Sequence, residues 1–302
     1  MISTVNRVFA GFVLAGAAGL SMAGPVILGG DDLTDHGSRS GAGANLAGWL
    51  YIEKAVGNVL SGVTRAGALT TDIVALGSAA NPAFNGGNAG GAIGSVGNVL
   101  GKTVTYIDGA AAINQFFVNL AGGFINPAML WFSGTGAVNN LDGTEGAALT
   151  SNAAAINAFG ASGGGIMAHG SGSSAYGWLS ALLPGLLEGG GCNSTGATLT
   201  AAGQAAFPGL SNSNIDGNAG PCHSSFSGNF GGLTTLAMDG GGLSYIIGGG
   251  AGTVIVCGQP GQPVCPPTGE VPEPSSLLLM TLAGLALVVQ QRRRRPGVVD
   301  QS

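Results

Sequence analysis

The sequence predicts an α/β fold, with a doubly wound, mostly parallel sheet and glycine-rich loops. Short apolar runs alternate along the chain with stretches of helical periodicity, which is the pattern of such sheets. Of the 302 residues, 45% are hydrophobic, enough to bury a core, and the 59 glycines follow no collagen or nonapeptide period. An all-β solenoid, to which so much glycine would also point, would not contain these helical runs.

The first three elements set the pattern. Residues 26–28 form an apolar strand that ends in Gly29-Gly30, residues 45–63 place apolar side chains at helical spacing, and residues 72–76 form a second strand. A strand, a helix and a strand open a parallel sheet. The expected later helices are 93–100, 110–120, 151–159 and 176–187. The expected later strands are 103–107, 128–132 and 165–168, followed by closing strands at 233–238, 244–247 and 253–256.

The N-terminal residues have the composition of a secretory signal peptide. Arg7 supplies the positive start, residues 9–20 form the apolar stretch, and Ser21-Met22-Ala23 places small residues where signal peptidase requires them. We predict a signal helix that is cleaved after Ala23. The alternative is a buried first helix, which the strand expected from residue 26 disfavours.

The four cysteines fit an exported protein. Cys192, Cys222, Cys257 and Cys265 lie in segments rich in Gly, Pro, Ser and Asn, and none forms a C-x-x-C pair suited to zinc or redox chemistry. We expect two disulfides. The favoured pairs are Cys192 with Cys222 and Cys257 with Cys265, because each pair brackets a segment without expected regular structure.

The charge of the exported part excludes two classes of partner. Residues 24–273 carry four basic side chains against thirteen acidic ones, a net charge of about −9. Nucleic acid and anionic lipid are therefore not expected as partners.

A short apolar segment near the C-terminus predicts a membrane anchor. Residues 275–289 provide about fifteen uncharged residues, fewer than the roughly twenty that span a bilayer unaided, and the flanking long side chains extend them by snorkelling. Arg292, Arg293, Arg294 and Arg295 follow, and the positive-inside bias places them in the cytoplasm. We expect a transmembrane helix with the body of the protein in the periplasm. A tail helix packed in a soluble core is the alternative, which four consecutive arginines disfavour.

The order of Pro272-Glu273-Pro274, apolar helix and arginine cluster resembles the PEP-CTERM sorting signal of Gram-negative bacteria. The resemblance implies that an exosortase, a membrane protease, processes the tail at Pro-Glu-Pro and releases or re-attaches the protein at the cell surface, often with exopolysaccharide. Signal peptidase, the exosortase and the inner membrane, as a transient anchor, are the expected partners. The expected organisation is a signal peptide (1–23), an exported α/β domain (24–256), a linker (257–270), the sorting signal (271–296) and a tail (297–302).

The candidate site lies in loops at strand ends. Open parallel sheets place their sites beyond the carboxyl ends of the strands. Three aspartates crowd the loop after the first strand, and the histidines also stand in polar loops. Neutral imidazole and carboxylate both bind divalent metals and exchange protons near neutral pH. The candidate catalytic residues are Asp32, His36, His169 and His223, with Asp32 or His36 expected within side-chain reach of His169. The alternative is that these side chains only cap helices or bond turn amides.

A second resemblance lies at "GGGIMAHGSG", residues 163–172. This Gly-rich turn, short strand and small-His-Gly sequence resembles the nucleophile-elbow region of the class I glutamine amidotransferase-like superfamily, which implies a flavodoxin-like sandwich. Ala168 stands where branches of that superfamily carry the nucleophilic cysteine. Alanine cannot attack a carbonyl, so the usual amidase or protease chemistry is in doubt.

Two function classes remain from the sequence. The first and favoured one is a cell-surface or matrix protein whose α/β domain binds something, such as exopolysaccharide, without turnover. The second is a secreted hydrolase that uses the Asp and His residues above, with or without a divalent metal. A serine hydrolase that uses a serine after His169 also stays open. The sequence assigns no cofactor beyond that metal.

Overall fold

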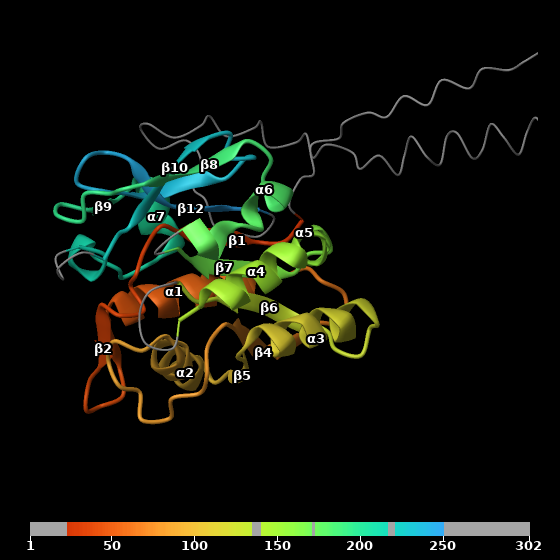
Figure 1. Cartoon of the computed structure of the whole chain (residues 1–302). Coiled ribbons are helices and arrows are strands. Elements are labelled where there is room, and N and C mark those ends of the chain that lie inside the picture. Colours follow the sequence, from red (N-terminus) through yellow and green to blue (C-terminus); the bar gives the residue numbers. More distant parts are fainter. Residues whose placement is uncertain (1–22, 135–139, 171–172, 217–220, 251–302) are drawn as a thin grey trace, which may run out of the picture. The chain divides into compact units, whose positions relative to one another are not determined.

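The computed structural model describes residues 23–134, 140–170, 173–216 and 221–250 (Figure 1). All of them belong to the same one of the two units into which the chain divides. Nearly all of the predicted signal peptide, the predicted strand 253–256 and the predicted transmembrane helix lie outside these residues. Within the described ranges, no helix has both the length and the apolar character that a bilayer crossing requires.

Five parallel strands form one half of a ten-stranded sheet, in the spatial order β5-β4-β6-β7-β1. Their bounds are β1 Val26–Gly29, β4 Leu69–Leu76, β5 Thr103–Ile107, β6 Pro127–Phe132 and β7 Gly165–His169. Strands β1, β6 and β7 are buried along their whole length. This burial is typical of parallel strands that are covered on both faces.

The other half of the sheet is antiparallel. Strand β12 pairs with β1 and continues the sheet through β10 to β8, while β11 pairs with β12 and β9. The bounds are β8 Leu186–Gly190, β9 Thr198–Leu199, β10 Ser224–Gly228, β11 Thr234–Met238 and β12 Ser244–Gly249. Strands β2 (Gly37–Arg39) and β3 (Asn45–Ala47) form a separate hairpin. The predicted closing strands 233–238 and 244–247 are confirmed as an antiparallel pair.

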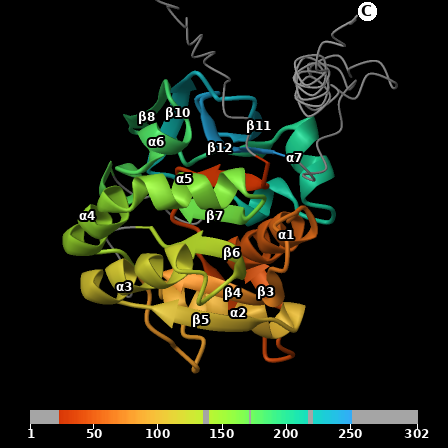
Figure 2. The same cartoon turned by 90° about the vertical axis from the view of Figure 1, so that its right-hand side faces the viewer.

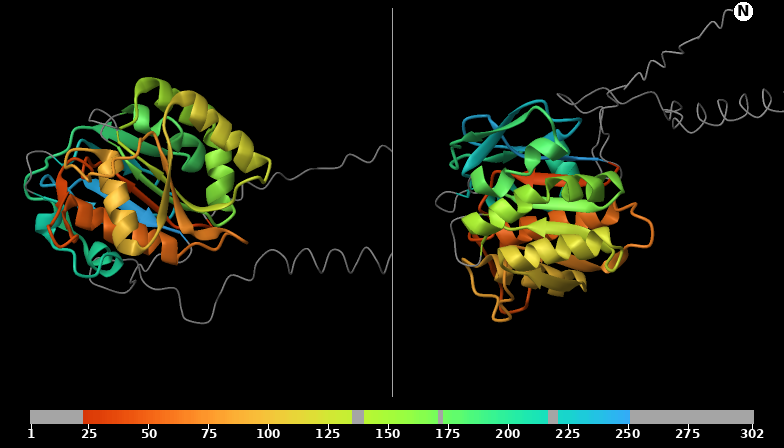
Figure 3. Two further views of the ribbon diagram at one scale, coloured as in Figure 1. Left: turned by 90° about the horizontal axis from the view of Figure 1, so that it is seen from below. Right: turned by 45° about the vertical axis from the view of Figure 1, so that its right-hand side comes forward.

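Helices cover both faces of the sheet (Figures 2 and 3). One face carries α1 (Gly48–Ser61), α2 (Ala89–Leu100) and α7 (Ala201–Ala206). The opposite face carries α3 (Ala110–Ala121), α4 (Gly143–Ser151), α5 (Ala153–Ala161) and α6 (Leu179–Leu182). Two 3-10 turns, η1 (Ser173–Tyr176) and η2 (Asn212–Asn214), complete the described elements.

Two hydrophobic cores result, one on each face. Successive side chains of β1 point to opposite faces, so Ile27 packs in the core with Trp49 of α1, whereas Val26 and Leu28 pack in the core with Phe159 of α5. A strand that feeds both cores has to be apolar throughout. This requirement explains the continuous apolar run at the start of the domain.

The strand order departs from the flavodoxin-like sandwich. Counted along the chain, the parallel strands lie in the order third, second, fourth, fifth, first, whereas the flavodoxin-like order is second, first, third, fourth, fifth. The two orders coincide only if the first strand is moved to the end of the series. A mixed α/β fold with a mostly parallel central sheet is confirmed, and the flavodoxin-like assignment is corrected in its connectivity.

The predicted helix 176–187 is wrong over most of its length. Only α6 is α-helical there. The helix does not continue through Pro184-Gly185, because proline lacks the N–H that a helix needs and Gly185 has a φ of +87°. Residues Leu186–Gly190 then form strand β8. The segment between Cys192 and Cys222, expected to lack regular structure, contains β9, α7 and η2.

Candidate functional site

The loops after β1 and β7 leave the sheet side by side. The two strands pair in parallel, with Gly29 opposite His169. The first and fifth predicted strands are therefore direct neighbours, and the polar residues that follow β1 lie beside the end of β7. The sheet thereby brings one aspartate onto His169, although it is Asp31 and not the predicted Asp32 or His36 that makes this contact.

His169 is held between two partners in the interior. Its Nδ1 lies 2.6 Å from Asp31 Oδ1, and its Nε2 lies 3.0 Å from Trp131 Nε1. An indole N–H can only donate, so Nε2 accepts, and we assign the ring proton to Nδ1, which donates to Asp31. The side chains of Asp31 and His169 are both fully buried. Both ring nitrogens of His169 are thus occupied, which leaves neither available to a metal or a substrate.

Three buried tyrosines surround the carboxylate of Asp31. Burial, and after it the negative charge of Asp31, raises the pKa of Tyr51, Tyr176 and Tyr245. Tyr176 donates its hydroxyl to the Gly29 carbonyl, and Tyr245 donates to the Ile215 carbonyl at 2.9 Å. Tyr176 and Tyr245 therefore remain neutral hydrogen-bonding groups. The Tyr51 hydroxyl and Oδ2 of Asp31 are buried without a hydrogen-bond partner among the described residues.

The glycines before Asp31 are required by close approach. A Cβ atom on Gly29 would lie 1.6 Å from Oδ2 of Asp31, and one on Gly30 would lie 2.0 Å from the carbonyl oxygen of Ser224. A side chain at either position would push the aspartate or strand β10 away. The two glycines of Gly-Gly-Asp therefore allow the Asp31 side chain to point into the interior.

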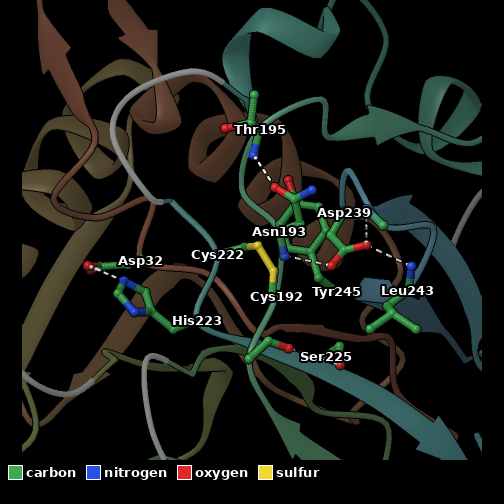
Figure 4. Close-up of a disulfide and its surroundings, with 12 residues drawn as sticks. Asp32, Cys192, Asn193, Thr195, Cys222, His223, Ser225, Asp239, Leu243 and Tyr245 are labelled. Atoms are coloured by element: carbon green, nitrogen blue, oxygen red, sulfur yellow. Dashed lines mark hydrogen bonds and ion pairs between the residues drawn. A yellow bond between two sulfur atoms is a disulfide. The ribbon is translucent and has the colours of Figure 1, made fainter.

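A second, more accessible cluster forms around Asp32. Its Oδ2 lies 3.0 Å from Nε2 of His223 and 3.8 Å from Nε2 of His36 (Figure 4 draws the first contact). The side chain of His223 is 43% exposed and that of His36 is 21% exposed, whereas Asp32 is largely buried. Asp35, one turn along the same loop, donates its backbone N–H to the Asp32 carbonyl at 3.0 Å. The four side chains form the Asp32 cluster.

The two carboxyl groups of the Asp32 cluster have raised pKa values. Burial, then repulsion from Asp31, raises the pKa of Asp32 from 3.8 to about 6. Burial, then repulsion from Asp32, raises the pKa of Asp35 from 3.8 to about 7. Oδ1 of each carboxyl is buried without a hydrogen-bond partner among the described residues. Such a pair retains a proton near neutral pH, beside two imidazoles that can exchange it.

The Asp32 cluster is not a preformed metal site. Among the described residues, one group of three potential ligand atoms lies within 4.8 Å of one another, and it consists of Cys192, Cys222 and Asp239. The two sulfurs of that group form a disulfide, which does not coordinate a metal as thiolates do. The ligand atoms around Asp32 are more widely spread, so acid–base chemistry fits this cluster better than coordination of one ion.

Replacing Asp35 with asparagine should flatten the pH dependence of stability. A carboxyl with a raised pKa binds more protons in the folded than in the unfolded state, so its contribution to stability falls as pH rises from about 4 to about 7. Asparagine does not ionise. We expect Asp35→Asn to raise the free energy of unfolding by on the order of 1 kcal/mol at pH 8 and little at pH 4.

Urea unfolding of the native chain, Asp35→Asn and Asp108→Asn, at pH 4 and pH 8, measures this effect. Asp108 is exposed, so its variant is the matched control and should follow the native chain. Equal pH dependence in native and Asp35→Asn protein would contradict the assignment.

A disulfide places His223 next to Asp32. Cys192 and Cys222 are bonded, with their Cα atoms 5.8 Å apart, which confirms the first predicted pair (Figure 4). Cys222 also bridges to Asp31 across an isolated antiparallel contact, and Asp32 donates its backbone N–H to the Pro221 carbonyl at 2.7 Å. Cys257 and Cys265 lie outside the described residues, so their pairing stays a prediction.

Comparison with known proteins identifies the C-terminal segment. Residues 270–295 match the PEP-CTERM protein-sorting motif. The chain carries an exosortase sorting signal. The PEP-CTERM motif implies an exported protein that is anchored in the membrane and then cleaved. The predicted tail of 271–296 agrees with the matched range to within one residue at each end.

The match to the sorting motif covers the C-terminal segment and not the α/β body. No curated protein and no solved structure matches the chain. The resemblance to the glutamine amidotransferase-like superfamily therefore has no support, and the strand order differs from that of a flavodoxin-like sheet. Ala168, which stands at the position of the nucleophile in that resemblance, is buried in the hydrophobic core and carries no reactive group.

The predicted site residues fall into two groups. Asp32, His36 and His223 come together in the Asp32 cluster, while His169 belongs to the buried network with Asp31 and Trp131. Asp31 and Asp35 are not among the predicted catalytic residues. The signal for Asp31 was available, because it directly follows the Gly-Gly that permits its inward turn.

Proposed function

We propose that the chain is a non-catalytic surface or matrix protein that an exosortase sorts and that associates with exopolysaccharide. Signal peptidase removes residues 1–23, the helix at 275–289 anchors the protein in the inner membrane, and the exosortase cuts near Pro272-Glu273-Pro274. The α/β domain is then periplasmic before it reaches the cell surface. The match of residues 270–295 to the sorting motif carries this proposal.

The state of His169 supports a role without turnover. Of the four candidate catalytic residues, His169 is the one that the sheet fixes most firmly, and its two ring nitrogens already bond Asp31 and Trp131. Neither can accept a proton from a nucleophile or bind a metal unless the buried network breaks. Ala168 supplies no nucleophile beside it.

The raised pKa values in the Asp32 cluster favour a second candidate, a secreted hydrolase. A carboxyl with a pKa near 6 or 7 retains a proton for a leaving group, and His223 is accessible to solvent. This enzyme would use Asp32, Asp35, His36 and His223, without His169. Turnover of any member of a panel of chromogenic glycosides, esters and phosphoesters, lost in Asp32→Asn, would favour it over the non-catalytic role.

A block of the Pro-Glu-Pro segment tests the sorting part of the proposal. We expect the triple variant Pro272→Ala, Glu273→Ala, Pro274→Ala to remain in the membrane fraction, because the exosortase no longer cuts it. The double variant Pro266→Ala, Pro267→Ala, just upstream of the matched motif, is the control and should be released like the native chain. Equal release of both variants, measured by immunoblot of cell fractions, would contradict exosortase processing at this site.

A further inference from the structure

A cavity of about 590 Å³ lies apart from the Asp32 cluster, on the face of the sheet that α3 covers. It opens between α3, the loop that follows α3, and strands β4, β5 and β6. Leu69 and Pro127, which line it, are the first residues of β4 and β6, whereas the Asp32 cluster follows the last residue of β1. Its volume is within the range of small-ligand sites.

The cavity has a buried apolar floor and an exposed aromatic rim. Val74 and Phe116 form part of the floor and are 5% and 4% exposed. Phe124, on the rim, is 81% exposed, and Leu69 is 55% exposed. The absence of a side chain at Gly122 makes room for the Phe124 ring, since a Cβ there would lie 2.6 Å from a ring carbon. The ring thus lies against the Gly122 backbone, and most of its surface stays in water.

Polar groups stand around this apolar surface. Asp72, Thr105, Gln115 and Asn119 all line the cavity. Gln115 Nε2 donates to Asn119 Oδ1 at 3.0 Å, and this bond uses neither the Asn119 amide N–H groups nor the Gln115 carbonyl oxygen. Thr71 donates to Oδ1 of Asp72 at 3.1 Å, which leaves the second carboxylate oxygen as an acceptor.

This wall suits a neutral saccharide. A sugar ring presents C–H groups on its faces, which pack on an aromatic ring, and hydroxyl groups at its edge, which both donate to and accept from amides and carboxylates. An acyl chain would instead bury the amides and the carboxylate without partners, at a cost for each group. Among the described residues that line the cavity, Asp72 is the one charged side chain, so an anionic sugar would find a like charge on the wall.

We propose that this cavity binds a neutral saccharide unit, with Phe124 against the sugar ring and Gln115, Asn119 and Asp72 on its hydroxyl groups. The inference rests on the proposed association with exopolysaccharide, to which it assigns a site and a class of sugar. It does not depend on exosortase sorting, because binding is measured with purified protein. A failure of sorting and a failure of binding are therefore separate results.

Affinity electrophoresis of the full chain in gels that contain a neutral or an acidic polysaccharide tests the proposal. The neutral probes are dextran, galactomannan and xyloglucan, and the acidic probe is alginate. We expect retardation by at least one neutral probe and none by alginate. Phe124→Ala and Asn119→Ala should each weaken the retardation at least tenfold. Leu243→Ala removes an apolar side chain that is 52% exposed on the β11–β12 turn, and it should leave binding unchanged.

Three results would overturn the proposal. The first is that no neutral probe retards the native chain, and the second is that alginate alone does. The third is that a neutral polysaccharide retards Phe124→Ala as strongly as the native chain. Analytical ultracentrifugation of the same variants covers the competing occupant, a second copy of this chain. If the native chain dimerises, Phe124→Ala is monomeric and no glycan binds, the cavity is an interface between copies.

Discussion

Asp31→Ala is expected to lower the free energy of unfolding by about 2–5 kcal/mol, because two buried donors lose their acceptor at about 1–3 kcal/mol each. Asp31 Oδ1 accepts from His169 Nδ1 at 2.6 Å and from the Leu33 backbone N–H at 3.1 Å, both in the interior. Alanine would leave both donors buried without an acceptor. Trp131 would still donate to His169, so the imidazole could not turn to find another partner without losing that bond.

Two further variants show whether the loss of stability comes from the Asp31 hydrogen bonds or from any substitution in this loop. Asp31→Asn retains an acceptor oxygen at the same place and should cost less than Asp31→Ala. Asp32→Ala removes the neighbouring carboxyl, whose raised pKa already reflects an unfavourable charge, and should change stability by about 1 kcal/mol or less. Urea unfolding at pH 7 measures all three. A loss of under about 1 kcal/mol in Asp31→Ala would show that the buried network does not stabilise the fold.

The double variant Cys192→Ser, Cys222→Ser is expected to lose about 3–4 kcal/mol of unfolding free energy. The bond joins residues 30 positions apart, and in the chain-entropy model a loop of that length restricts the unfolded chain by this amount. The loss should also loosen His223, because Cys222 precedes it and the bond ties this segment to the residues after β8.

Thermal unfolding with and without reductant provides the check. The native chain should lose stability on reduction, whereas the double variant should start at the lower value and respond to reductant only through Cys257 and Cys265. A double variant as stable as the oxidised native chain would show that the disulfide does not stabilise the fold.

The parallel half of the fold was predictable because its strands contain apolar runs and these alternate along the chain with helical periodicity. The expected strand 103–107 coincides with β5, and 165–168 differs from β7 by one residue. The antiparallel half carries a weaker pattern. Strand β10 has the sequence Ser-Ser-Phe-Ser-Gly, which alternates too little to predict a strand, and its pairing with β8 depends on residues far along the chain.

The expected helix 176–187 and the unexpected helix α4 both had local sequence signals that apolar periodicity obscured. Pro184-Gly185 interrupts the apolar residues of the expected helix 176–187, and it separates α6 from β8. Helix α4 was not expected, although Asp142 and Glu145 have the spacing of a capping box and form one in the structure. In both segments the proline, glycine and capping residues indicate the ends of the helices better than the spacing of apolar residues does.

The candidate site was predictable in its location but not in its partners. Both loops follow parallel strands, so their position at the same edge of the sheet follows from the expected topology. The direct pairing of β1 with β7 does not, because the flavodoxin-like order separates the first and fifth strands. Which aspartate turns inward depends on the backbone after Gly29 and Gly30, and the sequence pattern does not specify it. The contact of His223 with Asp32 depends on a disulfide partner 30 residues away and on β10.

The intact mass of the protein recovered from the culture medium shows whether the chain is exported and then processed by an exosortase. We expect a single species that begins after Ala23, ends near Pro272-Glu273-Pro274 and has lost Arg292 to Arg295. Its mass should fall short of the full chain by both terminal segments. Released protein that still carries the four arginines would contradict processing by an exosortase.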